Sequence, residues 1–127
     1  ALLWLEELNA SGDSGITDVS ALVNLTTLHA GNNSRIKDVS SLINLTTLNA
    51  SGDSGITDVS SLVNLTTLYV TYNSGITDIS SLVKLKQLNA DGVCGITDVS
   101  ALVNLEKLSA YGNNKICGIR PGTKVYR

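Results

Sequence analysis

Aspartate recurs once every 20 residues, at Asp18, Asp38, Asp58, Asp78 and Asp98. Neighbouring copies of a stacked repeat lie about 5 Å apart, so these carboxylates repel one another unless each is paired or hydrogen-bonded. Hard cations such as Ca²⁺ prefer oxygen ligands, so one interpretation is a cation-binding ridge. One carboxylate per turn supplies too few ligands for a calcium site, and each Asp stands two residues before a Ser. The pattern therefore favours a capping role, and no metal or other cofactor is expected.

Nucleophiles and general bases are scarce in this chain. His29 is the only histidine, and no Ser or Cys is arranged with it in a recognisable motif, so a catalytic triad is not predicted. Cys94 and Cys117 are the only thiols. They fall in neighbouring loops of the repeat, where a disulfide is geometrically feasible. Two separate reduced cysteines are the alternative, and the sequence leaves both open.

A strict internal repeat positions these residues. The pentapeptide Ile-Thr-Asp-Val-Ser begins at residue 16 and returns, barely altered, at 36, 56, 76 and 96. A fixed period of this length predicts a solenoid, in which each turn stacks on the one before it. Apolar positions two and three residues apart indicate a chain that turns repeatedly and points one residue per corner inward. Each repeat should contribute a short strand, such as 27–30, to one parallel sheet.

The repeat resembles that of leucine-rich-repeat proteins. Leu25-x-x-Leu28-x-Ala30-x-x-Asn33 matches the family pattern L-x-x-L-x-L-x-x-N, and residues 36–42 resemble the Ile-Thr-Asp-Ile-Ser type segment of the internalin-like branch. Two features depart from that branch: the repeats are shortened to 20 residues, and the third strand leucine is replaced by Ala or Val. Both departures predict a thin solenoid.

The resemblance covers residues 2 to about 120 and implies the fold class. We expect an α/β right-handed solenoid with a parallel sheet on the concave face and short 3₁₀ or extended segments on the convex face. Residues 1–120 should form one domain of about six 20-residue repeats, followed by a basic C-terminal tail at 121–127. Glycines at 15, 55, 75 and 95 predict a turn with positive φ, and Trp4 is expected to shield the first turn.

In this family, an Asn that follows the strand hydrogen-bonds backbone groups of adjacent turns. The matching positions form a predicted structural ladder: Asp13, Asn33, Asp53, Asn73 and Asn113. Val93 interrupts the row, so a local defect or a water is expected there.

Outward positions of the expected sheet are where the repeats differ most. Residues 8–28 and 48–68 differ only at Ala21 and Ser61, whereas aromatic side chains interrupt the small polar residues that face outward. Such aromatic residues anchor partners on recognition surfaces. The predicted partner-binding residues are His29, Asn49, Tyr69, Thr71, Gln87, Asn89, Asp91, Lys107 and Tyr111. The alternative is that these residue types simply tolerate an exposed strand.

Charge and hydropathy limit the classes of partner. Net charge is −2, and residues 115–127 contain basic but no acidic residues. These basic residues are spread out along the chain, which is more typical of a solvated terminus than of a surface that binds nucleic acid or anionic lipid. No 18-residue apolar run predicts a membrane span. The chain begins without an initiator Met, as a mature form or an excised piece would. Asn24, Asn44 and Asn64 are formal glycosylation sequons whose use the sequence does not decide.

The sequence therefore predicts a non-enzymatic module that binds a protein or glycan through the concave sheet face. The alternative is a structural repeat protein that assembles end to end into filaments or arrays. A weaker third hypothesis is a ubiquitin-transfer enzyme whose catalytic part lies elsewhere. Of the possible locations, the cell exterior or surface is favoured over the cytoplasm.

Overall fold

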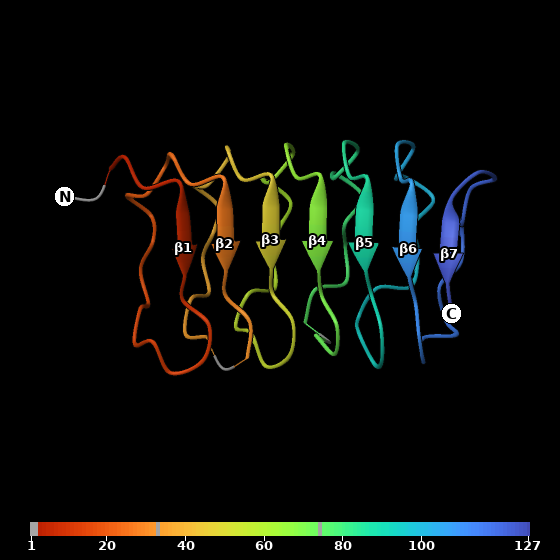
Figure 1. Cartoon of the computed structure of the whole chain (residues 1–127), viewed down its shortest axis with the longest axis horizontal. Helices are drawn as coiled ribbons and strands as arrows, with labels where there is room; N and C mark the ends of the chain where they lie inside the picture. The colour runs from red at the N-terminus through yellow and green to blue at the C-terminus, as the bar shows by residue number, and fades with distance from the viewer. Residues whose placement is uncertain (1–2, 33, 74) are drawn as a thin grey trace.

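The computed structural model describes residues 3–32, 34–73 and 75–127. Within these ranges it has seven short strands: β1 (Glu7–Asn9), β2 (Thr27–His29), β3 (Thr47–Asn49), β4 (Thr67–Tyr69), β5 (Gln87–Asn89), β6 (Lys107–Ser109) and β7 (Lys124–Tyr126). They form one sheet in sequence order, and every neighbouring pair is parallel (Figure 1). The predicted solenoid with a parallel sheet is confirmed.

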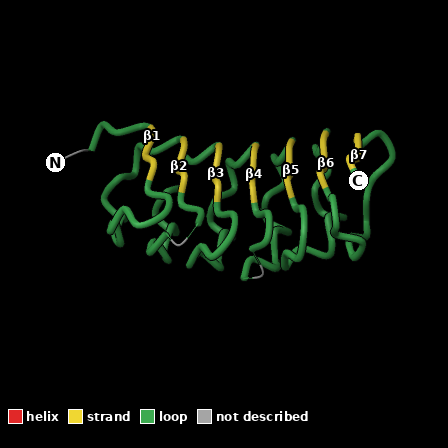
Figure 2. Tube along the Cα trace, turned by 60° about the horizontal axis from the view of Figure 1, so that its bottom comes forward, coloured by secondary structure: helices red, strands yellow, loops and turns green. Residues whose placement is uncertain are grey.

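Strand register follows directly from the 20-residue period. Leu8 stands opposite Leu28, and Leu28 stands opposite Leu48. From β1 to β6, each turn therefore repeats the one before it without a shift, and residues 20 positions apart stack into what we call columns. The last pair is closer in sequence, with Lys107 of β6 opposite Lys124 of β7. Figure 2 shows the strands together on one side of the chain, with the connecting loops behind and below them.

The core is aliphatic and narrow. In the second turn, Leu25, Leu28, Ala30, Ile36 and Val39 are all completely or almost completely buried. Complete burial of one Leu or Ile side chain contributes about 1.5–3 kcal/mol. These residues pack against the same positions of the turns on either side, so most of the stability comes from contacts between neighbouring turns.

Hydrogen-bonded turns build the return side, opposite the sheet. The N–H of Leu42 donates to the carbonyl of Val39 (3.0 Å), and the N–H of Leu45 donates to that of Leu42 (3.1 Å). No helix, 3₁₀ or otherwise, occurs in the described residues. Residues 40–46, between Val39 and β3, are too few to form a helix, and consecutive turns take its place.

Each of β1 to β6 is followed by a residue with positive φ at the third position after the strand. This column contains Gly12, Asn32, Gly52, Tyr72, Gly92 and Gly112. Of the four glycines expected to need positive φ, at 15, 55, 75 and 95, only Gly15 has it (φ 76). The prediction was wrong for the other three because the sharp change of direction comes directly after the strand.

Both ends of the molecule differ from expectation. Residues 121–127 are not a free tail, because Lys124–Tyr126 pair with β6 as β7, with Val125 opposite Leu108. Trp4 is 86% exposed and does not shield the first turn. It stands in the column of Asn24, an exposed position, so its ring does not point into the core. Leu5 and Leu8 of that turn are only partly buried.

Candidate recognition surface

The outward side chains of the strands, with the residues that directly follow each strand, form a surface that we call the sheet face. In β2, β3 and β4 the central leucine is buried and its two neighbours are half-buried. Side chains alternate along a strand, so the columns predicted to face outward do so. All nine predicted partner-binding residues lie here: His29, Asn49, Tyr69, Gln87, Asn89 and Lys107 in strands, with Thr71, Asp91 and Tyr111 after them.

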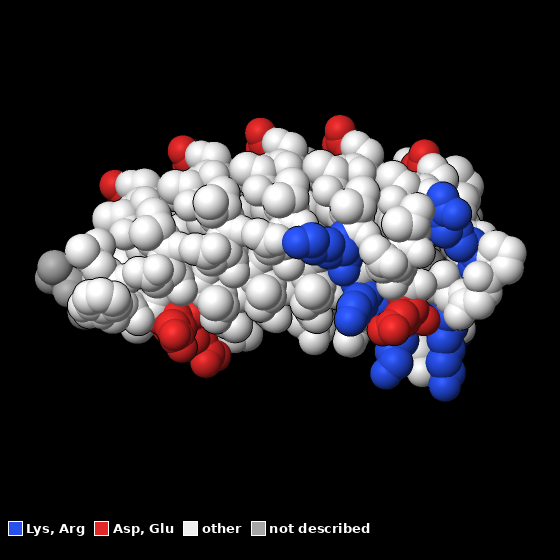
Figure 3. All heavy atoms as spheres, turned by 90° about the horizontal axis from the view of Figure 1, so that it is seen from above, with Lys and Arg blue, Asp and Glu red and all other residues white. Residues whose placement is uncertain are grey.

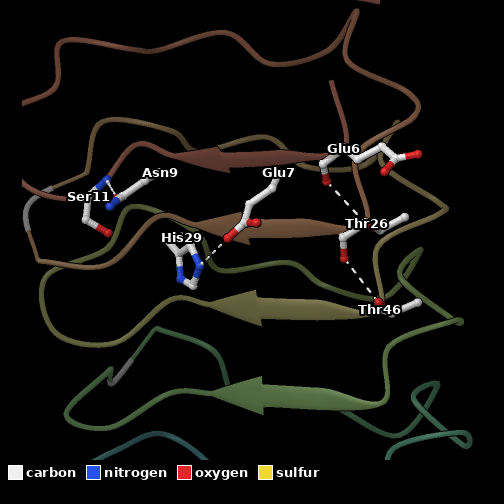
Figure 4. Close-up of polar contacts among 7 residues, drawn as sticks. All are labelled: Glu6, Glu7, Asn9, Ser11, Thr26, His29 and Thr46. Carbon is white, nitrogen blue, oxygen red and sulfur yellow. Dashed lines mark hydrogen bonds and ion pairs between the residues drawn. The ribbon is translucent and has the colours of Figure 1, made fainter. Parts of the chain in front are cut away.

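The first turns of the sheet face are small and polar. His29 Nε2 lies 3.5 Å from Glu7 Oε1, and the Glu7 side chain is largely exposed (Figure 4). Asn9 Oδ1 accepts a hydrogen bond from the N–H of Ser11 (3.1 Å), and Asn49 Oδ1 accepts the equivalent bond from Ser51 (3.1 Å). These bonds turn each Asn back onto its own chain, so the first turns offer few free polar groups.

The later turns carry a different arrangement, in which side chains bond across turns. Thr71 Oγ1 donates to Asn89 Oδ1 (2.7 Å). Asp91 Oδ1 accepts from Ser109 Oγ (2.7 Å) and from the N–H of Tyr111 (2.8 Å). Hydrogen bonds to a carboxylate are stronger than those between neutral groups, so Asp91 ties the loop after β5 to the end of β6 and to the loop that follows β6. This half of the sheet face is held in a defined conformation before any partner binds.

Tyrosines cluster on the same half. Tyr69 is half-buried in β4, whereas Tyr72 and Tyr111, in the loops after β4 and β6, are 65% and 53% exposed. Lys124 Nζ lies 5.4 Å from the centre of the Tyr126 ring in β7, a cation–π contact. Amphipathic rings on a polar, ordered surface are the side chains that most often anchor a protein partner.

The aspartate row lies on the side opposite the sheet, where red atoms line one edge of Figure 3. Asp38 Oδ1 accepts from the N–H of Ser40 (2.9 Å) and from its hydroxyl (2.6 Å), which confirms the capping role. Asp58 and Asp78 do the same. These bonds lower the pKa of Asp38 more than its neighbours Asp18 and Asp58 raise it. In the described part of the chain, no group of three or more His, Cys, Asp and Glu could hold a metal ion.

Comparisons with known proteins agree with this architecture. The model of a family of leucine-rich repeats, in two copies, matches residues 43–84. The fold is that of a leucine-rich-repeat solenoid. No curated protein sequence matches it.

Solved internalin structures from Listeria monocytogenes share the fold. The functional domain of InlJ, which includes a cysteine ladder, matches with 25% identity and a TM-score of 0.61, over 91% of this chain and 32% of that one. An internalin C2 matches with 25% identity and a TM-score of 0.57, over 88% and 55%. An internalin, InlF, matches with 24% identity and a TM-score of 0.53, over 85% and 42%. The chain thus spans between about a third and just over half of these structures.

The predicted ladder is present at two of the four ladder positions that the structure describes. Asn73 Nδ2 donates to the carbonyl of Ala50 (2.6 Å), and Asn113 Nδ2 donates to that of Ala90 (3.0 Å). Both side chains are buried, whereas Asp13 and Asp53 are exposed. Asn33 lies outside the described residues.

In the other turns, the next residue along the chain takes the inward place. Ser14 Oγ donates to the carbonyl of Ala10 (3.1 Å), and Cys94 Sγ donates to that of Ala90 (3.4 Å). This explains Val93, which is exposed because Cys94 points inward in its stead. The expected defect at Val93 is therefore replaced by a change of inward residue.

A second ladder runs along the turns before the strands, and it was not predicted, because a repeated Asn alone does not indicate a bond between turns. Asn24, Asn44, Asn64 and Asn104 each donate from Nδ2 to the carbonyl one turn earlier, at 2.6, 3.0, 2.8 and 2.8 Å. Lys84 replaces Asn in this column and reaches Asn64 Oδ1 (2.9 Å). A glycan on one of the three sequons, Asn24, Asn44 and Asn64, would sit on an amide that already holds two turns together.

The two cysteines do not form the disulfide that the sequence left open. Both thiols are free: Cys94 is half-buried, and Cys117 is exposed. Cys117 pairs with Asp98 in an isolated bridge, so it stacks over the capping segment. Cys94 instead points inward and lies 3.2 Å from Asn113 Nδ2. Burial raises the pKa of the Cys94 thiol.

Proposed function

We propose that the chain is a non-enzymatic binding module that recognises a protein partner through the later half of its sheet face. The observation that carries this proposal is the network from Thr71 to Asn89 and from Asp91 to Ser109 and Tyr111. Side chains already fixed in one conformation lose less entropy on binding, which favours affinity. Tyr69 and Tyr111 supply the aromatic anchors on either side of this network.

A protein suits this surface better than a small ligand does. The binding residues lie on the outside of short strands, and hydrogen bonds link them sideways into a continuous surface. Broad surfaces with aromatic anchors and a polar surround are typical of protein–protein interfaces. A glycan presented on a protein would use the same tyrosines, so enzymatic deglycosylation of a captured partner separates these two cases.

The test compares the wild-type chain with variants of the sheet face. A partner captured from the source organism would be purified, and its affinity measured by calorimetry for Tyr69→Ala, Tyr111→Ala and Asp91→Ala. We expect each Tyr variant to lose about 2 kcal/mol or more, a factor of about 30 in Kd, with little change in melting temperature. The matched control is Lys37→Thr, which restores the usual residue of that column on the opposite side and should bind as the wild type does.

If Tyr69→Ala and Tyr111→Ala both keep full affinity while Lys37→Thr loses it, the sheet face is not the working surface. Asn24, Asn44 and Asn64 are unsuitable controls, because each bonds the turn before it. Changes there would lower stability and binding together.

End-to-end assembly is the second candidate, and one observation favours it. Leu5, Leu8, Ile16 and Leu22 of the first turn line an open hollow of about 340 Å³, and β1 has no neighbour on its outer side among the described residues. An exposed strand edge beside apolar side chains is a site for strand addition. Sedimentation over a range of concentrations would show an open-ended series of sizes if the chains assemble in this way.

We infer that the protein is extracellular or lies at the cell surface, which is supported by the likeness of its fold to the internalins. The described residues contain no helix long and apolar enough to cross a membrane. Immunolabelling of intact and permeabilised source cells tests the inference, since only a surface protein is labelled on intact cells.

A further inference from the structure

An unbroken column of large aliphatic side chains is exposed along the edge where the strands begin. Its members are Leu3, Val23, Ile43, Val63, Val83 and Val103, with exposed fractions of 43–56%. We call this column the apolar ridge. Its positions lie in the turns that cross from the return side to the sheet, one in each of six successive turns. At about 4.8 Å per turn it is about 24 Å long.

The fold does not require apolar residues in this column. The core is already filled by Leu22-type and Leu25-type columns on either side, such as Leu42 and Leu45, which are fully buried. Neighbouring columns are polar, with the exposed Asn44 and the half-buried Thr46 in the same turn. A continuous exposed apolar row with polar borders marks an interaction surface rather than a random surface residue.

Charges next to the ridge are separated between its two ends. The first turn contributes Glu6 and Glu7. The middle turns have uncharged Thr and Asn in these and the adjacent columns. The later turns contribute Lys84, Lys86, Lys107 and Lys124, with Glu106 as the one acid among them. Figure 3 shows this separation, with red at the N-terminal end, white along the middle and mainly blue toward the C-terminal end.

We propose that the apolar ridge is a dimer interface, occupied by the ridge of a second copy running in the opposite direction. In this arrangement the acidic end of each copy meets the basic end of the other, at both ends of the interface. A parallel arrangement would set acid against acid and base against base, which costs free energy. An interface in which the same surface serves both copies is the usual form of a two-fold dimer.

Register follows from the even spacing of the ridge. Full overlap places Ile43 opposite the partner's Val63, Val23 opposite the partner's Val83, and Leu3 opposite the partner's Val103. The acidic first turn then faces the sixth turn, where Lys107 offsets the charge of Glu106, and the adjacent β7, where Lys124 adds a further positive charge. Every ridge residue is covered, and no apolar residue of the column is left without a partner.

The direction of pairing also decides where the two sheets point. A two-fold axis that reverses the ridge and brings the two edges together must run perpendicular to the sheet. Both sheet faces therefore point the same way, and the dimer presents two copies of the recognition surface side by side. The two aspartate rows lie together on the opposite, solvent-exposed side. A partner with repeated epitopes would bind such a dimer with increased avidity.

Because the ridge is narrow, its buried area lies at the low end of the range for specific interfaces. We therefore expect a dissociation constant of roughly 10–100 μM. Sedimentation equilibrium of the full chain, from about 1 to about 500 μM, should show a monomer–dimer equilibrium that stops at the dimer. Ile43→Thr with Val63→Thr should raise the dissociation constant at least about tenfold, without lowering the melting temperature. The matched control is Val93→Thr, since Val93 is 76% exposed but lies off the ridge.

Charge reversal and cross-linking test the direction. Glu6→Lys with Glu7→Lys should weaken the dimer, and adding Lys107→Glu with Lys124→Glu should restore it. In a Cys94→Ser, Cys117→Ser background, a mixture of Ile43→Cys and Val63→Cys chains should cross-link into mixed dimers more readily than either chain alone. Preferred cross-linking of Ile43→Cys to itself would overturn the antiparallel pairing. A monomer at about 500 μM, open-ended growth, or a dimer insensitive to the Thr substitutions would overturn the ridge as the interface.

Discussion

The ring of Tyr72 lies against Gly92, the residue one turn further along the same column. A Cβ at Gly92 would overlap the ring, since it would stand 2.6 Å from Cδ1 and 2.7 Å from Cζ of Tyr72. Both residues have positive φ, 57° for Tyr72 and 71° for Gly92. The absence of a side chain at Gly92 is therefore what allows an exposed aromatic ring to lie flat on the next turn.

Gly92→Ala should thus lose more stability than Gly12→Ala. Both substitutions place Ala at positive φ, which costs about 1 kcal/mol, but a Cβ at Gly12 meets nothing closer than 3.9 Å. We expect Gly92→Ala to cost about 1 kcal/mol more than Gly12→Ala in urea unfolding. Adding Tyr72→Ala should remove the difference. Equal losses in the two single variants would show that the ring is not packed on Gly92.

Asn73→Ala should lower the free energy of unfolding by about 2–3 kcal/mol. The substitution leaves the carbonyl of Ala50 and the N–H groups of Gly75 and Ile76 without their partner in a buried loop. Asp53→Ala is the matched control, because Asp53 stands in the same column but is exposed, and it should cost less than about 0.5 kcal/mol. Urea titrations of both variants would measure the difference, and similar losses would contradict an inward ladder at Asn73.

Acid should destabilise the solenoid through the capping aspartates. Hydrogen bonds from Ser40 lower the pKa of Asp38 below its usual value of 3.8, and the equivalent serines do the same for Asp58 and Asp78. Because the folded-state pKa is the lower one, this stabilisation is present above pH 3.8 and is lost as the pH falls toward the folded value.

The variant with Asn at Asp38, Asp58 and Asp78 keeps an oxygen acceptor at each cap but does not titrate. Its melting temperature should therefore fall less steeply than that of the wild type below about pH 4, in scans from about pH 6 to about pH 2.5. The two proteins should have nearly the same melting temperature at neutral pH. Parallel curves through the acid range would mean that the caps do not govern acid unfolding.

The two thiols should react at different rates. Cys94 is half-buried with a raised pKa, whereas Cys117 is exposed, and the thiolate is the reactive form. Titration with a thiol reagent at neutral pH should show a fast phase that Cys117→Ser removes and a slow phase that Cys94→Ser removes. Cys94→Ser should change stability by less than about 0.5 kcal/mol, because Ser14 makes the same bond to a carbonyl. A single phase in the native protein would contradict the inward position of Cys94.

The repeat made the architecture predictable, because a fixed period sets strand register wherever one face is buried. The leucine columns, the capping aspartates and the outward columns of the sheet could all be read from spacing alone. The residue that points inward in each loop could not be predicted from spacing. Asn73 points inward where its N–H bonds the carbonyl of Val70 in a tight turn, whereas in the first turn Ser14 points inward. The choice between adjacent residues depends on backbone conformation, which one-letter identity does not specify.

The outward orientation of the sheet columns was predicted, but the hydrogen bonds between their side chains could not be predicted from the sequence. Asp91 looks like one more polar residue in a variable column, and only the structure shows that it bonds both Ser109 and Tyr111. The apolar ridge was missed for a different reason. A valine next to core leucines, such as Val63 between Leu62 and Leu65, is expected to be buried. The structure instead leaves it exposed on the outside of the turn.

Stacking at a constant interval of 20 has a consequence for how such a chain can change length. The side chain of Asn44 donates a hydrogen bond to the carbonyl of Val23, and that of Asn64 donates to the carbonyl of Ile43, each 21 positions earlier in the chain. If residues 41–60 were excised, Asn64 would meet the carbonyl of Val23, and Leu68 would follow Leu28 in the sheet. The near-identity of 8–28 and 48–68 makes such a recombination easy at the gene level. The molecule can therefore be shortened or extended by whole turns, and its reach adjusted, without a new core having to evolve.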